Sequence, residues 1–109
     1  MTERPQNVLI VDGYATGTQY AARIRARGMK PYHITSGWEK LSSFSPDFMN
    51  KYIKSQVGGL YEACWRMPDD LEQAVQKLRP YRFAAVIPGT ETGVIAAETL
   101  ALRLGLPVN

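Results

Sequence analysis

Two loop segments contain residue types that can bind a small charged ligand. The first runs from Asp12 to Thr18 and the second from Pro88 to Gly93, each between an aliphatic run and a helical pattern. Glycines let the backbone approach a ligand closely, and the free amides at the start of a helix favour an anion. The first loop therefore predicts a phosphate or carboxylate near Gly13, Thr16 and Gly17. These glycines match neither the dinucleotide fingerprint nor a P-loop, so tight strand-to-helix turns explain them equally well.

The second loop carries one acid, Glu91, at the place where a ligand crevice should open. A carboxylate there can accept hydrogen bonds from a substrate ammonium, an interaction worth about 1.5–3 kcal/mol when charge assists it. The alternative role is local, because a negative side chain in the first turn of a helix gains about 0.3–1 kcal/mol from the helix dipole. Both interpretations stay open at this point. The flanking Gly89, Thr90 and Thr92 complete the predicted substrate-binding set.

Other reactive residue types favour structural roles. Asp12 could act as a nucleophile or metal ligand, but it lacks the second nearby acid that such sites use, so hydrogen bonding to the next turn is preferred. His33 has no Ser, Cys or acid partner at a recognisable spacing, which favours a packed or surface position. Cys64 is interpreted as a core residue, and packing is preferred to pocket lining for Trp38 and Trp65. We predict no catalytic residue and no metal ligand in the chain.

The composition is that of one soluble domain, with 109 residues, 45% of them hydrophobic and 21% charged. The net charge of +3 comes from dispersed Lys and Arg residues that form no dense basic stripe, so nucleic-acid binding is not expected. Cys64 is the only cysteine, which excludes an internal disulfide and indicates a reducing compartment, by default the cytoplasm. No apolar stretch approaches the roughly 20 residues that span a bilayer, so no membrane segment is expected.

Aliphatic runs and helical spacing alternate along the chain. The predicted strands are Val8–Val11, Pro31–Thr35, Leu60–Arg66 and Phe83–Ile87, the last with the same buried pattern as the first. The predicted helices span Thr16–Arg27, start at Ser45-Pro46-Asp47, follow a capping box of Asp69 and Glu72, and run from Thr90–Gly93 to Gly105. The apolar faces of the first and last helices are expected to contain Tyr20, Ala21, Ile24, Val94, Ala97, Ala101 and Leu104.

This alternation predicts an α/β fold with an open, mainly parallel, Rossmann-like sheet of about four strands and helices on both faces. Ligands of such sheets bind outside the carboxyl ends of the strands, where neighbouring connections diverge to opposite faces. Both candidate loops follow predicted strands. If the strand order is the usual one, the first and last strands are neighbours and the two loops face one crevice.

Several segments together resemble the N-terminal domain of ATP-grasp carboxylate–amine ligases. They are Val8–Gly13, the Ser45-Pro46 helix start, Val86–Val94 and Arg103–Pro107. The specific part is the Gly-Thr-Glu-x-Gly-Val stretch, followed by a helix that ends in Arg-Leu-Gly-Leu-Pro. The resemblance covers essentially the whole chain and is closest to the branch that joins amino acids into dipeptides. It implies that residues 1–109 form one pre-ATP-grasp domain, a fragment of a longer ligase.

The resemblance also implies a chemistry. Such ligases phosphorylate a carboxylate with ATP and Mg²⁺, and an amine displaces the phosphate from the acyl phosphate. The family's N-terminal glycine loop and the glutamate matching Glu91 border the substrate site, whereas its ATP and metal residues lie in later domains. The chain is therefore expected to have no cofactor of its own and no activity alone. Its partners would be the central and ATP-grasp domains and small-molecule carboxylate and amine substrates; the oligomeric state stays open, a homodimer included.

Two other readings compete with the ligase fragment. A stand-alone flavodoxin-like small-ligand-binding module is suggested by Thr16-Gly17-Thr18, which resembles part of a flavin phosphate loop. A phospho-receiver domain is suggested by Val8–Asp12, but the acidic pair and the acceptor aspartate of that fold are missing. The ligase reading differs from both because it predicts an exposed apolar edge that missing domains would cover.

Overall fold

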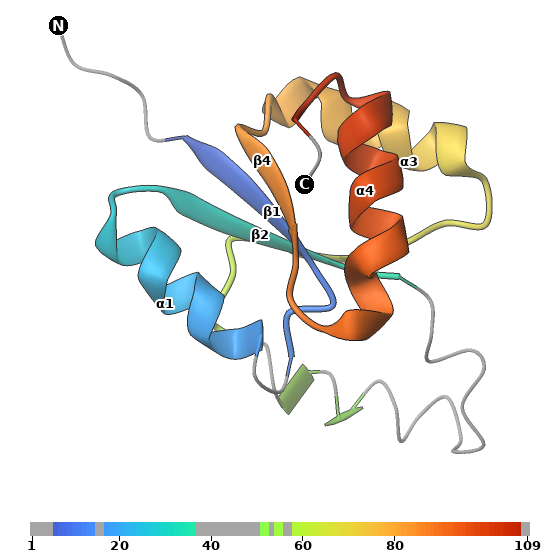
Figure 1. Ribbon diagram of the computed structural model, residues 1–109. Coiled ribbons are helices and arrows are strands. Elements are labelled where there is room, and N and C mark those ends of the chain that lie inside the picture. The colour runs from blue at the N-terminus through green and yellow to red at the C-terminus, as the bar shows by residue number, and fades with distance from the viewer. Residues whose placement is uncertain (1–5, 15–16, 37–50, 53, 56–57, 108–109) are drawn as a thin grey trace, which may run out of the picture.

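The computed structural model describes residues 6–14, 17–36, 51–52, 54–55 and 58–107. Four parallel strands form one open sheet in the order β3-β2-β1-β4 (Figure 1). The strands are β1 (Asn7–Val11), β2 (Lys30–Thr35), β3 (Cys64–Arg66) and β4 (Ala85–Pro88). The predicted α/β fold with an open parallel sheet of about four strands is confirmed.

Helices cover both faces of the sheet, as the sequence predicted. α1 (Thr18–Ala26) lies on one face, and α3 (Leu71–Leu78) and α4 (Val94–Arg103) lie on the other (Figure 1). Two short 3-10 turns, η3 (Arg79–Tyr81) and η4 (Glu91–Gly93), follow α3 and precede α4. Among the described residues, no helix is long and apolar enough to cross a membrane.

The central position of β1 explains its unbroken aliphatic sequence. Successive side chains of a strand point to opposite faces. Val8 and Ile10 therefore pack beneath α1, whereas Leu9 and Val11 pack with residues of α3 and α4. Since β2 and β4 flank it and helices cover it on both sides, Leu9, Ile10 and Val11 are 0% exposed.

β4 lies at an edge of the sheet, and its burial corrects one expectation. All four residues from Ala85 to Pro88 are only partly buried, so the expectation of a strand as buried as β1 was wrong. The reason is positional: within the described residues, β4 pairs with β1 alone, and its other side has no neighbour. Phe83 is buried as expected, but it precedes the strand.

Two helical faces also differ from the prediction. Tyr20 is 36% exposed, because it lies about 100° around α1 from its buried neighbour Ala21. In α4 the buried residues are Ala97, Leu100 and Ala101, and Val94 is 38% exposed. Val94 lies over the open side of β4, where no further strand of the described part of the chain covers it.

The segment around β3 is shorter and more exposed than expected. Only Cys64–Arg66 forms a strand, and Cys64 is exposed rather than part of the core, because β3 is the other edge of the sheet. Trp65 is half-buried and stacks on Tyr32 with ring centroids 5.6 Å apart. Trp65 thus packs as preferred from the sequence, but it also lines a cavity of ≈ 230 Å³. Trp38 lies outside the described residues.

The start of α3 is capped one residue later than predicted. The Asp70 carboxylate accepts a hydrogen bond from the Glu72 amide at 2.9 Å, so Asp70, not Asp69, is the N-cap. The Glu72 carboxylate pairs instead with Arg103 at the end of α4. The predicted helix start at Ser45-Pro46-Asp47 lies outside the described residues.

Candidate functional site

The two loops singled out in the sequence converge at the carboxyl edge of the sheet. β1 and β4 are adjacent and parallel, as the expected strand order required, and the Gly89 amide donates to the Val11 carbonyl at 2.7 Å. A Cβ placed on Gly89 would lie 2.6 Å from Gly13 Cα, and one on Gly17 would lie 2.7 Å from the Gly89 oxygen. The loops therefore touch backbone to backbone. Glycine is required here for close approach of the two loops.

Asp12 connects this pair of loops to the end of β2. Its carboxylate is fully buried and accepts hydrogen bonds from the Ser36 amide at 2.8 Å and the Ser36 hydroxyl at 2.6 Å. The Thr92 hydroxyl donates a third bond at 2.8 Å. A structural role for Asp12, preferred from the sequence, is thus confirmed, but its partners follow β2 and β4 rather than its own turn. Its φ of 58° is a conformation that aspartate tolerates better than most residues.

The two predicted threonines belong to the same network. The Thr90 hydroxyl donates to the Asp12 carbonyl at 3.1 Å and lies 3.0 Å from the Thr92 hydroxyl. The Tyr14 hydroxyl is also 3.0 Å from the Thr92 hydroxyl. Both threonine hydroxyls therefore have protein partners, and their evident role is to hold the second loop against the first.

The glycine amides of the first loop also have protein acceptors. The Gly13 amide donates to Nε2 of His33 at 2.8 Å, and the Gly17 amide donates to the Tyr14 carbonyl at 2.9 Å. An anion at Gly13 and Gly17 would have to compete with these bonds. Thr16, the third residue of the predicted anion site, lies outside the described residues.

Glu91 differs from its neighbours because it is exposed. It is the first residue of η4 and lies next to Thr90, beside the point where the loops meet. Within the described part of the chain it has no ion-pair partner closer than 4 Å. Its carboxylate is thus available to a ligand ammonium while also lying in a helical first turn, so the geometry is compatible with both roles considered from the sequence.

A clamp on Gly13 was not anticipated from the sequence. His33 accepts the Gly13 amide, and the Tyr61 hydroxyl donates to the Gly13 carbonyl at 2.9 Å. The two rings stack with centroids 4.8 Å apart. The packed interpretation of His33 is confirmed, since it is fully buried. The pairing of β1 with β2 explains why His33 is buried. His33 lies opposite Ile10, whose side chain packs beneath α1, so the imidazole faces the same covered side of the sheet.

The protonation of the clamp follows from these bonds. Nε2 accepts a hydrogen bond, so the proton of the neutral ring is on Nδ1, which is buried and has no partner among the described residues. Burial lowers the pKa of His33 to about 4. Burial also raises the pKa of Tyr61, so its phenol keeps the proton that it donates to Gly13.

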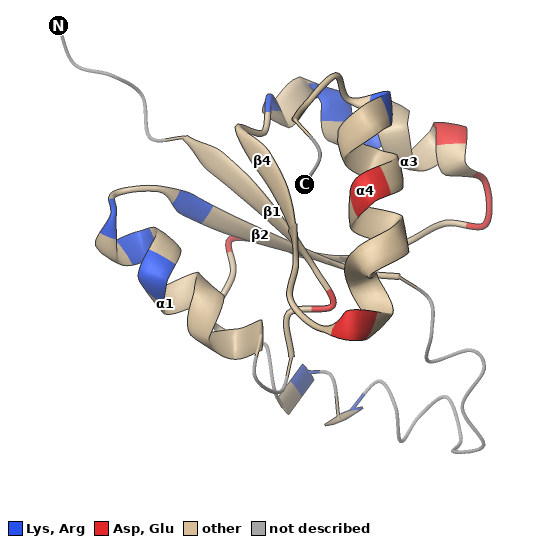
Figure 2. Cartoon of the chain, viewed as in Figure 1, with Lys and Arg blue, Asp and Glu red and all other residues tan. Residues whose placement is uncertain are grey.

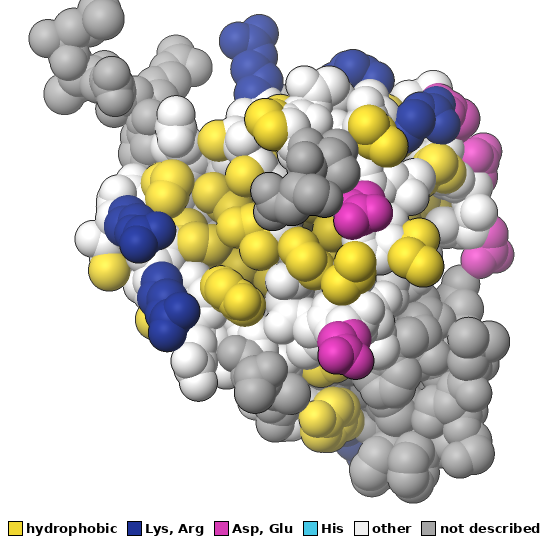
Figure 3. Space-filling model, viewed as in Figure 1, with side chains coloured by type: hydrophobic (Ala, Val, Ile, Leu, Met, Phe, Trp, Pro, Cys, Tyr) yellow, Lys and Arg dark blue, Asp and Glu magenta, His cyan; other side chains and the backbone are white. Residues whose placement is uncertain are grey.

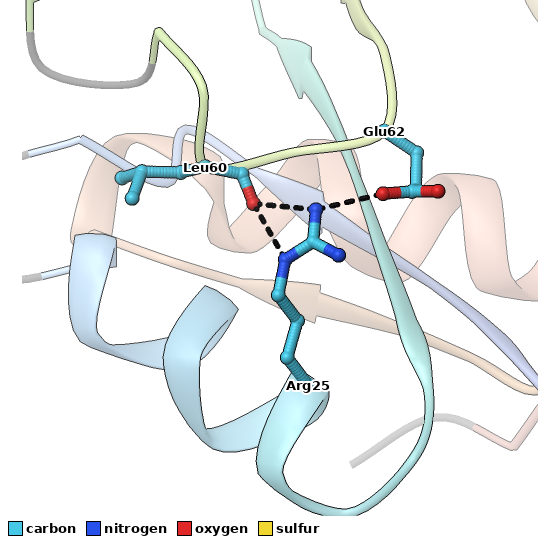
Figure 4. Close-up of polar contacts among 3 residues, drawn as sticks. All are labelled: Arg25, Leu60 and Glu62. Carbon is cyan, nitrogen blue, oxygen red and sulfur yellow. Dashed lines mark hydrogen bonds and ion pairs between the residues drawn. The ribbon is translucent and has the colours of Figure 1, made fainter.

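An ion pair fastens the segment that carries Tyr61 to α1. The Arg25 guanidinium contacts the Glu62 carboxylate at 2.7 Å and also donates to the Leu60 carbonyl at 3.1 and 3.2 Å (Figure 4). Both side chains are substantially exposed, so the pair itself stabilises little. Among the described residues, the other basic side chains lie at separate places on α1, β2, β3, α3, α4 and the short segments that connect these elements, and they form no single stripe (Figure 2).

A cavity of ≈ 340 Å³ lies beside the loops rather than between them. Its lining comes from the ends of β2 and β3, the start of α3 and one side of α4, and includes Ser36, Met67, Asp69 and Thr99. Ser36 connects it to the Asp12 network. The size is at the lower end for small-molecule sites. No local sequence signal marks it, because its walls come from separate segments. Among the described residues, no three His, Cys, Asp or Glu side chains form a group that could hold a metal ion.

The fold is similar to that of an L-amino acid ligase from Bacillus licheniformis, whose crystal structure is known. The two structures agree with a TM-score of 0.62 at 19% sequence identity, over 99% of this chain and 26% of that chain. This chain thus spans about a quarter of the length of that ligase. No protein-family model and no curated protein matches the sequence. The resemblance drawn from the sequence is therefore confirmed at the level of the fold.

Removal of the buried carboxylate should loosen the site measurably. Asp12→Ala leaves the part-buried amide and hydroxyl of Ser36 without their acceptor, at about 1–3 kcal/mol for each unsatisfied group, so we expect a loss of at least about 2 kcal/mol in the free energy of unfolding. Asp70→Ala is the control, because it removes an exposed helix cap worth about 1 kcal/mol. Urea unfolding measures both. Equal losses would contradict the network assigned to Asp12.

The stability of the protein should depend on the protonation of His33. The unfolded chain binds the proton with a pKa near 6.5 and the folded chain near 4, so stability falls as the pH is lowered from 6.5 to 4. The contribution is about 3 kcal/mol. His33→Gln keeps an acceptor for the Gly13 amide but does not titrate, so its unfolding free energy should fall less over this range.

Because His33 is the only histidine, its ring resonances can be followed by NMR without ambiguity. We expect them to titrate near pH 4 in the folded protein. A midpoint near 6.5 would show that the imidazole is not held neutral against Gly13.

Proposed function

We propose that this chain is the substrate-side N-terminal domain of an ATP-dependent carboxylate–amine ligase that joins amino acids or peptides through an acyl phosphate. The observation that carries the proposal is the agreement of the fold with an L-amino acid ligase over 99% of the chain. The sequence resemblance adds to it independently, because its specific stretch, Gly89–Val94, forms the loop that meets the β1 loop at the carboxyl edge.

In this proposal the chain positions a substrate and does not catalyse the reaction. The Asp12 network and the clamp on Gly13 hold both loops rigidly, so that the exposed Glu91 carboxylate keeps a constant place at the rim. There it accepts hydrogen bonds from the ammonium group of the amine substrate before that group is deprotonated for attack. The described residues offer no metal-binding group, and we assign ATP and Mg²⁺ to the rest of the ligase.

The strand order argues against the competing readings. Flavodoxin-like and receiver domains place the first strand between the second and third. Here β1 lies between β2 and β4, and β3 is at the edge beyond β2. This is the order of the first four strands of a Rossmann sheet, 3-2-1-4.

The apolar edge expected of a ligase fragment is present. Ile95 and Leu102 on α4 are 79% and 67% exposed, and hydrophobic side chains gather over β4 and α4 on one face of the molecule (Figure 3). Large exposed apolar patches mark surfaces that contact other protein. This edge supports a domain that functions within a larger protein.

The reaction class is tested on the intact ligase that contains this chain. The enzyme is incubated with ATP, Mg²⁺, single amino acids and hydroxylamine, which captures an activated carboxylate as a hydroxamate. We expect hydroxamate together with ADP and phosphate. Formation of AMP instead would indicate an acyl adenylate, and no nucleotide turnover with any amino acid would refute the proposed ligase activity.

The role of Glu91 is tested by kinetics of the same enzyme. Loss of a charge-assisted hydrogen bond of about 1.5–3 kcal/mol should raise the KM for the amine roughly ten- to a hundred-fold in Glu91→Ala, with the KM for ATP nearly unchanged. Glu72→Ala is the control, since Glu72 is another exposed carboxylate in a helical first turn. An unchanged amine KM in Glu91→Ala would leave Glu91 only its interaction with the helix dipole.

A further inference from the structure

The open edge of β4 lacks the features that usually prevent strand pairing. No residue from Ala85 to Pro88 is charged, and none is fully exposed or fully buried. Natural edge strands are commonly protected by lysines, bulges or covering loops. Pro88 is the one protective feature of β4, because it has no amide hydrogen that could bond to a further strand.

The hydrogen-bond register shows which backbone groups face the open side. The Asp12 amide donates to the Ile34 carbonyl, and the Lys30 amide donates to the Gln6 carbonyl. The even-numbered residues of β1 therefore direct their polar groups to β2 and the odd-numbered ones to β4. The bond from the Gly89 amide to Val11 then places the odd-numbered residues of β4 toward β1. The amide and carbonyl of Val86 therefore point outward, and those of Ile87 point inward.

A groove runs along this edge on the α4 side. Its volume is ≈ 160 Å³, and its lining is apolar except for Glu98: Val86, Pro88, Val94, Ala97, Ala101 and Pro107. On the opposite face of the sheet, Ala85 and Ile87 pack against the cluster beneath α1. A strand added beside β4 would therefore find apolar surface on both of its faces, as an interior parallel strand requires.

The topology determines which strand fits. β3 connects through α3 to β4, and this connection crosses the sheet in the direction of β4. α4 lies on the same face as α3, and crossovers between parallel strands are right-handed. A connection from β4 through α4 consequently leads to a parallel strand beyond β4. Pro107 already borders the groove after the end of α4.

We propose that the open side of β4 and the α4 groove receive a fifth parallel strand from the part of the ligase that follows α4. The inference rests on the proposed function, and it names the surface through which this domain joins the rest of the enzyme. In the similar L-amino acid ligase, further polypeptide is available to form such a strand, since this chain corresponds to only 26% of that chain. The strand would be aliphatic and would bond to the outward amide and carbonyl of Val86.

Hydrogen exchange at two neighbouring amides tests the proposal. In the 109-residue chain the Val86 amide should exchange rapidly, whereas in the intact ligase it should be protected at least about 100-fold more. The Ile87 amide, bonded within the sheet, should be protected in both and is the internal control. Rapid exchange of Val86 in the intact ligase overturns the proposal. Protection in the 109-residue chain that rises with its concentration also overturns it, in favour of a second copy.

A pair of substitutions makes the test independent of the isolated chain. In the intact ligase, Val94→Glu replaces an apolar side chain of the groove by a second carboxylate beside Glu98 and should increase exchange at Val86 at least about tenfold. Tyr20→Glu is the matched control, because Tyr20 is about as exposed as Val94 (36% against 38%) but lies on α1, outside the groove, and should leave the exchange unchanged. Equal exchange in both variants refutes the surface. The hydroxamate assay is separate, so failure of the docking surface can be distinguished from failure of the ligase proposal.

Discussion

The buried carboxylate of Asp12 organises the carboxyl edge of the sheet. A fully buried charge is costly unless several donors surround it, and here the Ser36 amide, the Ser36 hydroxyl and the Thr92 hydroxyl do so. These donors follow β2 and β4, whereas Asp12 follows β1. One side chain thereby fixes three strand ends relative to one another. The candidate site inherits its rigidity from this arrangement, because Glu91 lies between two of the threonines that the network holds.

Close contact between the two glycine loops has a functional consequence. In many open α/β sheets a ligand occupies the crevice where the connections diverge. Here Gly13, Gly17 and Gly89 bring the backbones together, so the loops themselves occupy that space. Among the described residues near this edge, the rim at Glu91 and the cavity beside Ser36 remain open to a ligand. This shape fits the proposal that the domain borders a substrate site that another part of a larger protein completes.

β1 lies inside the sheet and β4 lies at its edge, and this difference in position explains several departures from the sequence-based expectations. Aliphatic residues in β1 and β4 look alike in the sequence, but β1 has a neighbour on each side and β4 has one. The same asymmetry leaves Val94 exposed above β4 and leaves Cys64 exposed on β3 at the opposite edge. The proposed fifth strand would bury the apolar surface that distinguishes the β4 edge from the β3 edge.

The sequence by itself determined the α/β class, the parallel sheet and the positions of both loops, because hydrophobic periodicity and turn residues act over short distances along the chain. It also indicated that Asp12 is structural and that His33 is packed or exposed at the surface rather than catalytic. Only the tertiary structure decided that His33 and Tyr61 clamp Gly13 and that β4 is an open edge. These features depend on contacts between residues far apart in the sequence and on strand order, and neither leaves a local pattern that a linear reading can detect.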